Sequence, residues 1–187
     1  VPAVGSMISM ALCPLLIKKL NERNAYILLS VYGFAASIFS FVIGHFWFQS
    51  PKNMVLTVLF YASLFLIGLQ FGAVTLMPMI MTADAVDYYE YETGKRMEGA
   101  CYSILTLTIK VCLALGTAVG LIFVQKSGYY ESLTAGTFTT KTKDIIFFAY
   151  TALPGILALI SIFPMFKYDI VGEKKAKISY ELAARRK

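Results

Sequence analysis

The chain has 187 residues, of which 58% are hydrophobic and only 15% are charged. A soluble globular domain has about 25% charged residues, so this composition argues against a soluble protein and favours a membrane protein. The formal net charge is +6, but the basic residues lie between and after the apolar stretches. That distribution is typical of membrane topology, and we therefore expect no nucleic-acid partner.

Five apolar stretches follow one another along the chain. A helix needs roughly 20 residues to cross about 30 Å of hydrocarbon at about 1.5 Å per residue. On this basis the sequence predicts membrane spans over 4–17, 25–48, 54–83, 99–125 and 145–166, and then a basic tail over 167–187. The first range is too short for a full crossing, so we interpret it as a span truncated at its N-terminus. We expect an all-α, polytopic membrane protein that is a piece of a longer polypeptide.

The stretch 54–83 is longer than a helix perpendicular to the membrane requires. We expect it to tilt, or to bend near Pro78. Gly68 and Gly72 bracket Gln70 in this stretch, which predicts one face for close helix packing and one buried amide.

The polar connections predict the topology. If the spans alternate, the turn 18–24, the connection 84–98 and the tail share one side of the membrane and hold most of the 17 basic residues. Lys and Arg in short loops are enriched on the cytoplasmic side. We therefore expect the C-terminus to lie in the cytoplasm.

Lys110 lies near the middle of the span 99–125, about 16 Å from either end of the helix. A lysine at the bilayer centre costs roughly 2.5 to 3.5 kcal/mol, so it should face a carboxylate or a wet cavity. Ser103 and Thr106 share a stripe with it at helical spacing. No acidic residue lies within the spans to balance Lys110, so we expect its partner in sequence outside this chain. The alternative is a lysine that pairs with a neighbouring helix and never touches a solute.

The connection 84–98 holds a second group of charged residues. Asp84 and Asp87 are three residues apart and share a face if the preceding helix continues, while Arg96 follows a turn at Gly94. Ion pairs between them are geometrically easy, and they could form and break as an inner gate. The alternative is a solvated loop whose charges meet only water.

An enzyme remains a weaker interpretation. Asp84 and Asp87 at a membrane boundary could hold Mg²⁺ and a diphosphate, as in membrane prenyltransferases. Such enzymes need a second acidic motif, which this chain lacks. We also predict no metal site, because His45 is the only histidine and is better explained as an interfacial side chain. We therefore expect a protein that is not an enzyme and has no catalytic residues.

The run DAVDYYEYETGKRMEGACYS at 84–103, followed by TLTIK ending at Lys110, resembles one segment of a known family. This segment joins the tenth and eleventh helices of the glycoside-pentoside-hexuronide:cation symporters. That family includes the melibiose and glucuronide permeases and belongs to the major facilitator superfamily. On this likeness the chain corresponds to about helices eight to twelve of a twelve-helix fold, and the N-terminal half of the same protein is missing.

The resemblance implies a secondary active transporter that couples a cation to a sugar, glycoside or hexuronide by alternating access. It places Lys110 and Thr106 at the substrate and cation cavity, and we add Gln70 and Thr75 as candidates. Thr75 stands where melibiose-type members have an aromatic residue, which predicts a different sugar specificity.

By position, Asp84, Asp87 and Arg96 match the inner gate network of that family. The partners we expect are the solute, a coupling cation (Na⁺ or H⁺) and the lipid bilayer, with no other cofactor. The expected location is the bacterial inner membrane. The alternative within the superfamily is a carrier of lipid or of another solute.

Overall fold

The computed structural model describes residues 1–185, so the last two residues of the expected tail 167–187 lie outside the described residues. Every regular element in the described part is a helix, which confirms the all-α prediction. Four helices are long and apolar enough to cross a membrane. Where the bilayer crosses them stays a prediction.

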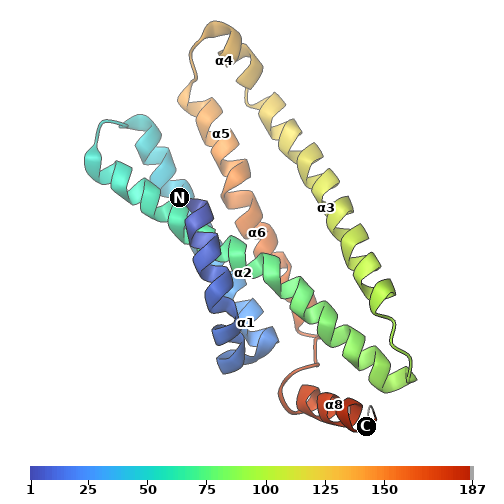
Figure 1. Cartoon of the computed structure of the whole chain (residues 1–187). Helices are drawn as coiled ribbons and strands as arrows, with labels where there is room; N and C mark the ends of the chain where they lie inside the picture. Colours follow the sequence, from blue (N-terminus) through green and yellow to red (C-terminus); the bar gives the residue numbers. More distant parts are fainter. Residues whose placement is uncertain (186–187) are drawn as a thin grey trace.

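Helix α1 (Pro2–Gln49) contains the first two expected spans, joined at Asn21. Asn21 has φ 64° and ψ 162°, a backbone conformation that interrupts the helix. Pro2 packs on Gly68 and Ser6 on Gly72, so the first half of α1 runs parallel to α2. Gly33 lies beside Gln70 and Ser40 beside Ser63, so the second half of α1 runs antiparallel to α2. The chain therefore reverses at Asn21, and both halves of α1 lie against α2 (Figure 1).

Helix α2 (Met54–Thr93) begins at Asn53, whose side chain accepts hydrogen bonds from the backbone N–H groups of Val55 and Leu56. It continues through Pro78 and beyond the expected boundary at 83, so Asp84 and Asp87 lie on the helix itself. It ends at Gly94, whose φ of 70° is readily adopted by glycine. The turn predicted at Gly94 is therefore present.

Gly68 and Gly72 let the backbones of α1 and α2 approach each other closely. A Cβ atom at Gly68 would lie 2.2 Å from the carbonyl oxygen of Pro2, and one at Gly72 would lie 2.1 Å from that of Ser6. Both distances are shorter than any real contact, so only glycine lets α1 and α2 pack this closely. The predicted close-packing face is confirmed.

Helix α3 (Glu98–Lys126) contains no buried residue. It approaches α2 beside the turn at Gly94 and α5 at its other end, where the Phe123 and Phe148 rings are 6.2 Å apart. Between these contacts its apolar side chains, such as Ile104 and Leu113, are exposed.

The region after α3 consists of a short helix and an interrupted apolar stretch. The stretch 126–144, which lies between two expected spans, contains α4 (Tyr129–Ala135). The Thr142 hydroxyl of α5 (Thr140–Tyr150) donates to the carbonyl of Ser127, just before α4. The expected span 145–166 falls almost entirely within Thr140–Met165, the fourth helical stretch long and apolar enough to cross a membrane, which is interrupted and consists of α5, α6 (Ala152–Ile160) and α7 (Ile162–Met165). The breaks fall at Thr151 and Ser161, three residues before Pro154 and Pro164, because proline removes a helical hydrogen bond.

Helix α8 (Gly172–Arg185) occupies most of the expected basic tail. It buries Ile178 and Leu182, which are one helical turn apart, and leaves its charged residues half-buried or exposed. It lies at the same end of the molecule as the reversal in α1 and the turn between α2 and α3 (Figure 1). The three basic segments therefore lie at one end of the molecule, and the side of the membrane that this end faces stays a prediction.

Candidate functional site

Lys110 and Thr106 lie on one face of α3, along an open groove that Tyr102 and Ser103 also line. Both side chains are exposed in the chain as described. No ion pair to Lys110 exists among residues 1–185, so its ammonium group has three N–H donors without a carboxylate partner. The stripe predicted from helical spacing is thus present as one continuous surface.

The hydroxyl groups of this stripe donate their protons within the helix. Thr106 donates to the Tyr102 carbonyl at 2.8 Å, and Ser103 donates to the Gly99 carbonyl at 2.7 Å. A hydroxyl that has given its only proton to the backbone can still accept a hydrogen bond. Toward a solute, Lys110 is therefore a donor and Thr106 an acceptor.

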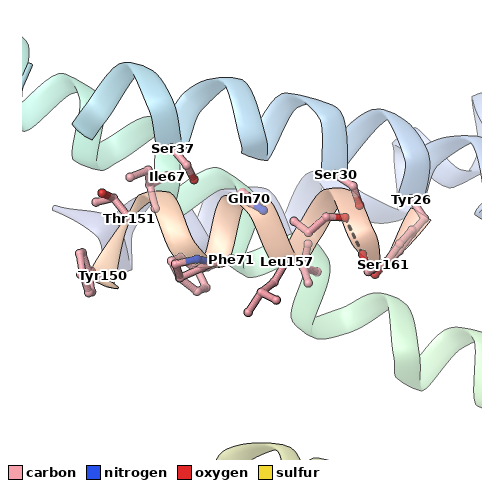
Figure 2. A pocket seen from close by; sticks show the side chains of 13 residues that line it. Tyr26, Ser30, Ser37, Ile67, Gln70, Phe71, Tyr150, Thr151, Leu157 and Ser161 are labelled. Atoms are coloured by element: carbon pink, nitrogen blue, oxygen red, sulfur yellow. Dashed lines mark hydrogen bonds between the residues drawn. The ribbon is translucent and has the colours of Figure 1, made fainter. Parts of the chain in front are cut away.

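Gln70 lies in a different place, a cavity of about 260 Å³ between the second half of α1, α2 and α6. Figure 2 shows Ser30 and Ser37 on α1 facing this cavity beside Gln70, with the Tyr26 hydroxyl donating to Ser161 at 2.8 Å. The Gln70 side chain is only 8% exposed, as the predicted buried amide requires. It fits because α1 has Gly33 opposite, where a Cβ would lie 1.9 Å from the Gln70 Cδ.

Thr75 is exposed on α2, and its hydroxyl donates to the Phe71 carbonyl at 2.7 Å. The structure therefore brings Lys110 and Thr106 together, but places Gln70 in a separate cavity within the bundle. Thr75 lines neither the groove nor that cavity. The role of all four residues at a solute site stays a prediction.

Arg96 is the centre of one charged cluster beside the turn between α2 and α3. Its guanidinium contacts Glu90 at 2.9 Å, Glu98 at 3.1 Å and Asp87 at 3.3 Å. Two of the three expected gate residues, Asp87 and Arg96, are thus in contact. Arg96, Asp87 and Glu98 are partly exposed, whereas the Glu90 side chain is only 15% exposed. Ion pairs between exposed groups contribute little to stability, so the Arg96 pairs with Asp87 and Glu98 can open and close readily.

Asp84 belongs to a second cluster and does not contact Arg96. Its carboxylate accepts from Lys175 of α8 at 2.7 Å and from the Tyr168 hydroxyl at 3.2 Å. Lys175 also binds Glu22, at the reversal in α1, at 2.6 Å. No sequence pattern selected Glu22, Tyr168 or Lys175, because each of them lies far from Asp84 along the chain. The only local hint was the spacing of Ile178 and Leu182, which is typical of an amphipathic helix.

The surroundings of Lys175 and Tyr168 favour the protonated form of both. Burial lowers the pKa of Lys175, but its hydrogen bonds to Asp84 and Glu22 and their charges outweigh burial and raise it overall. Burial, and next the charge of Asp84, raise the pKa of Tyr168. A raised pKa in the folded state stabilises the cluster at every pH below the ordinary value, about 10 for both groups. The stabilisation is lost only as the pH rises through the raised values.

Comparison with known proteins identifies the family. Residues 1–172 match the model of the family described as MFS/sugar transport protein. The chain is 24% identical over 187 residues to a glucuronide carrier protein homolog of Escherichia coli, covering 98% of this chain and 38% of that protein. It is 25% identical over 183 residues to a putative sulfoquinovose importer of the same organism, covering 97% of this chain and 36% of that one.

A third relative is an uncharacterized 29.9 kDa protein of Pseudescherichia vulneris, 30% identical over 129 residues, or 69% of this chain and 45% of that protein. The chain therefore spans less than half the length of these relatives. No solved structure matches it. The family and the names of the relatives exclude the enzyme interpretation. The chain belongs to the family described as MFS/sugar transport protein, within the major facilitator superfamily, and its long apolar helices are those of an integral membrane protein.

Proposed function

We propose that the protein is a cation-coupled symporter that carries a sugar, glycoside or hexuronide by alternating access, and that this chain is its C-terminal part. The observation that carries the proposal is Lys110, a cation in the middle of an apolar helix with no carboxylate partner in residues 1–185. Exposing such a side chain to lipid is costly, so a wet solute path is the favourable surrounding.

The chemistry of the groove supports a solute rich in hydroxyl groups. Lys110 offers N–H donors, Thr106 offers an acceptor, and Tyr102 offers an aromatic face. These are the groups that fix a sugar within a mostly apolar cleft. A hexuronide would add a carboxylate that Lys110 can bind directly.

The exposed apolar residues of α3 support a larger assembly. Ile104 is 66% exposed and Leu113 65% exposed, on a helix that has no buried residue. In the full-length protein these residues would be covered by lipid and by the other helices of the transporter. The face that holds Lys110 would then border the path between the two halves.

The test is uptake by the full-length protein in proteoliposomes, with a panel of glycosides, hexuronides and lysolipids. We expect Lys110→Ala to abolish concentrative uptake, a loss of about 100-fold or more, while insertion and folding persist. Lys126→Ala is the matched control, because Lys126 lies at the end of the same helix, and it should keep near wild-type uptake.

Three results would contradict the proposal. Coupled uptake by Lys110→Ala at the wild-type rate would remove Lys110 from the solute path. Uptake of lysolipids alone would favour the lipid-carrier alternative. Uptake that responds to neither a Na⁺ nor a H⁺ gradient would rule out coupling, because a coupling cation must favour the solute-binding state.

A further inference from the structure

A second groove lies between the two halves of α1, with α2 beneath them. It has a volume of about 410 Å³ and is lined by residues of α1 and α2 only. None of these residues lines the groove that holds Lys110 on α3. The second groove is therefore a separate surface, and the proposed solute path does not use it.

Small side chains create this groove. Cys13 is 2% exposed and Ala73 is 1% exposed, and both belong to the core where α1 meets α2, so they form the floor. Leu12 and Leu15 also line the groove but are 53% and 62% exposed, so they form its rim. Apolar side chains beside an empty groove lose van der Waals contacts on one side, so an apolar occupant is favourable.

The groove runs along the first half of α1. Its lining residues Ser9, Leu12, Leu16 and Lys19 follow one another at steps of three or four residues, which places them on one face of the helix. From Ser9 to Lys19 the helix rises about 15 Å, at about 1.5 Å per residue. The hydrocarbon core of a bilayer is about 30 Å thick, so the groove is as long as one leaflet is deep. An acyl chain of a phospholipid fits that length.

One end of the groove is positively charged. Lys19 is the only charged residue in its lining, and it lies just beyond the expected span 4–17, beside the reversal in α1. The Lys19 side chain is exposed and has no ion pair within residues 1–185. The carboxylate of the neighbouring Glu22 is bound to Lys175 at 2.6 Å. The ammonium group of Lys19 is therefore available to an anion at the membrane surface.

The rest of the lining offers little to a polar ligand. The Tyr32 hydroxyl donates its proton to the Leu66 carbonyl at 3.0 Å, and Ser9 lies at the end opposite Lys19. A sugar needs several hydrogen-bonding groups that converge on it, and this groove has none. A single positive charge at one end of an apolar groove instead complements an anionic headgroup on an acyl chain.

We propose that this groove binds one anionic phospholipid of the phosphatidylglycerol type, with an acyl chain along Leu12 and Leu15 and the phosphate on Lys19. A zwitterionic lipid binds less well, because its own ammonium group is repelled by the lysine. The lipid stays at the protein surface and is not the transported solute. The inference depends on the position of α1 in the membrane, and not on the proposed transport function.

The test uses the full-length protein in phosphatidylcholine nanodiscs that contain a small fraction of a photoreactive lipid. The photoreactive group, a diazirine, is in the acyl chain, and the headgroup is either phosphatidylglycerol or phosphatidylcholine. After illumination, the protein is digested with chymotrypsin, which does not cut at lysine, and mass spectrometry locates the labelled residues. We expect phosphatidylglycerol to label residues 9–19 about fivefold more than phosphatidylcholine does.

Two variants test the headgroup. Lys19→Gln should lower labelling of residues 9–19 by phosphatidylglycerol about fivefold and remove its advantage over phosphatidylcholine. Lys18→Gln is the matched control, because Lys18 is also exposed and without an ion pair in residues 1–185, but does not line the groove. It should change the labelling less than twofold. Lys19→Arg, which keeps the charge, should resemble the wild type.

Two further variants test the acyl chain. Leu15→Trp fills the groove and should lower labelling of residues 9–19 by both lipids about fivefold or more. Leu28→Trp is its control, because Leu28 is 49% exposed on the second half of α1 and does not line the groove. Leu15→Trp also tests the site if Lys19→Gln fails to fold.

Equal labelling of residues 9–19 by the two lipids would overturn the proposal, because the groove would then hold only bulk lipid. Unchanged labelling in Lys19→Gln or in Leu15→Trp would overturn it as well. If the wild-type protein is labelled elsewhere but not within residues 9–19, another helix of the full-length protein covers the groove and the proposal is wrong.

Discussion

Two buried serines on the second half of α1 differ in the hydrogen bonding of their hydroxyl groups. Ser30 and Ser40 are both completely buried. Ser63 donates its proton to the Phe60 carbonyl at 2.7 Å, so the 2.9 Å contact between Ser40 and Ser63 has Ser40 as its donor. The Ser30 hydroxyl has no hydrogen-bond partner among the described residues and lies at the cavity beside Gln70.

This difference predicts opposite effects of removing the two hydroxyl groups. Ser40→Ala should lower the free energy of unfolding by about 0.5–1.5 kcal/mol, because it deletes a buried hydrogen bond. Ser30→Ala should change it by about 0.5 kcal/mol or less, or raise it, because no protein hydrogen bond is lost. Thermal unfolding of the two variants in detergent measures both effects. A larger loss in Ser30→Ala than in Ser40→Ala would contradict the assignment.

At the scale of the helices, two glycine pairs of the same spacing have different roles. Gly68 and Gly72 on α2 lie against the backbone of α1, whereas a Cβ added at Gly116 or Gly120 on α3 would meet no atom within 4 Å. The sequence alone gives both pairs the same interpretation. Only the packing shows that a neighbouring helix of this chain lies against Gly68 and Gly72.

We predict that Gly72→Ala destabilises the chain and Gly116→Ala does not. The new Cβ at Gly72 would lie 2.1 Å from the Ser6 carbonyl oxygen, so the first half of α1 must move away. Such overpacking costs about 1–3 kcal/mol. Gly116→Ala should instead stabilise α3 by up to about 1 kcal/mol, because alanine favours the helix. The comparison is made by thermal unfolding in detergent, and equal destabilisation by both substitutions would contradict the packing.

At the scale of the whole molecule, opposite ends have different chemistry. One end holds the reversal in α1, the turn at Gly94 and α8, with the ionic clusters of Lys175 and Arg96. The other end is aromatic, with Trp47 stacked on Phe60 at 4.5 Å and His45 bonded to Asp144 at 2.9 Å. In membrane proteins Trp and Tyr mark both interfaces, whereas an excess of Lys and Arg in short loops marks the cytoplasmic one.

The positive-inside bias predicts that the charged end faces the cytoplasm. Single cysteines at Asn24, Tyr180 and Lys52 test it, because Lys52 lies in the turn at the aromatic end. A maleimide that cannot cross the membrane should label Lys52→Cys in intact cells. It should label Asn24→Cys and Tyr180→Cys only after the cells are permeabilised. The reverse pattern would show that the charged end lies outside.

Within single segments, the sequence was sufficient to predict the helical class, the turn at Gly94, the close-packing face at Gly68 and Gly72, and the stripe of Lys110 and Thr106. These features follow from local composition and from the spacing of residues along one helix, which short stretches of sequence already contain. The breaks at Thr151 and Ser161 were missed, although prolines stand just after them, because strong hydrophobicity dominated the interpretation of 145–166.

Contacts between distant segments required the tertiary structure. Asp84 and Asp87 look equivalent in sequence, but α8 provides a lysine for Asp84, whereas the turn between α2 and α3 provides an arginine for Asp87. Gln70 and Lys110 both look like solute ligands, yet they belong to separate surfaces. Local patterns fix which face of a helix is polar. Which partner that face meets depends on how the chain brings distant segments together, and no single segment contains that information.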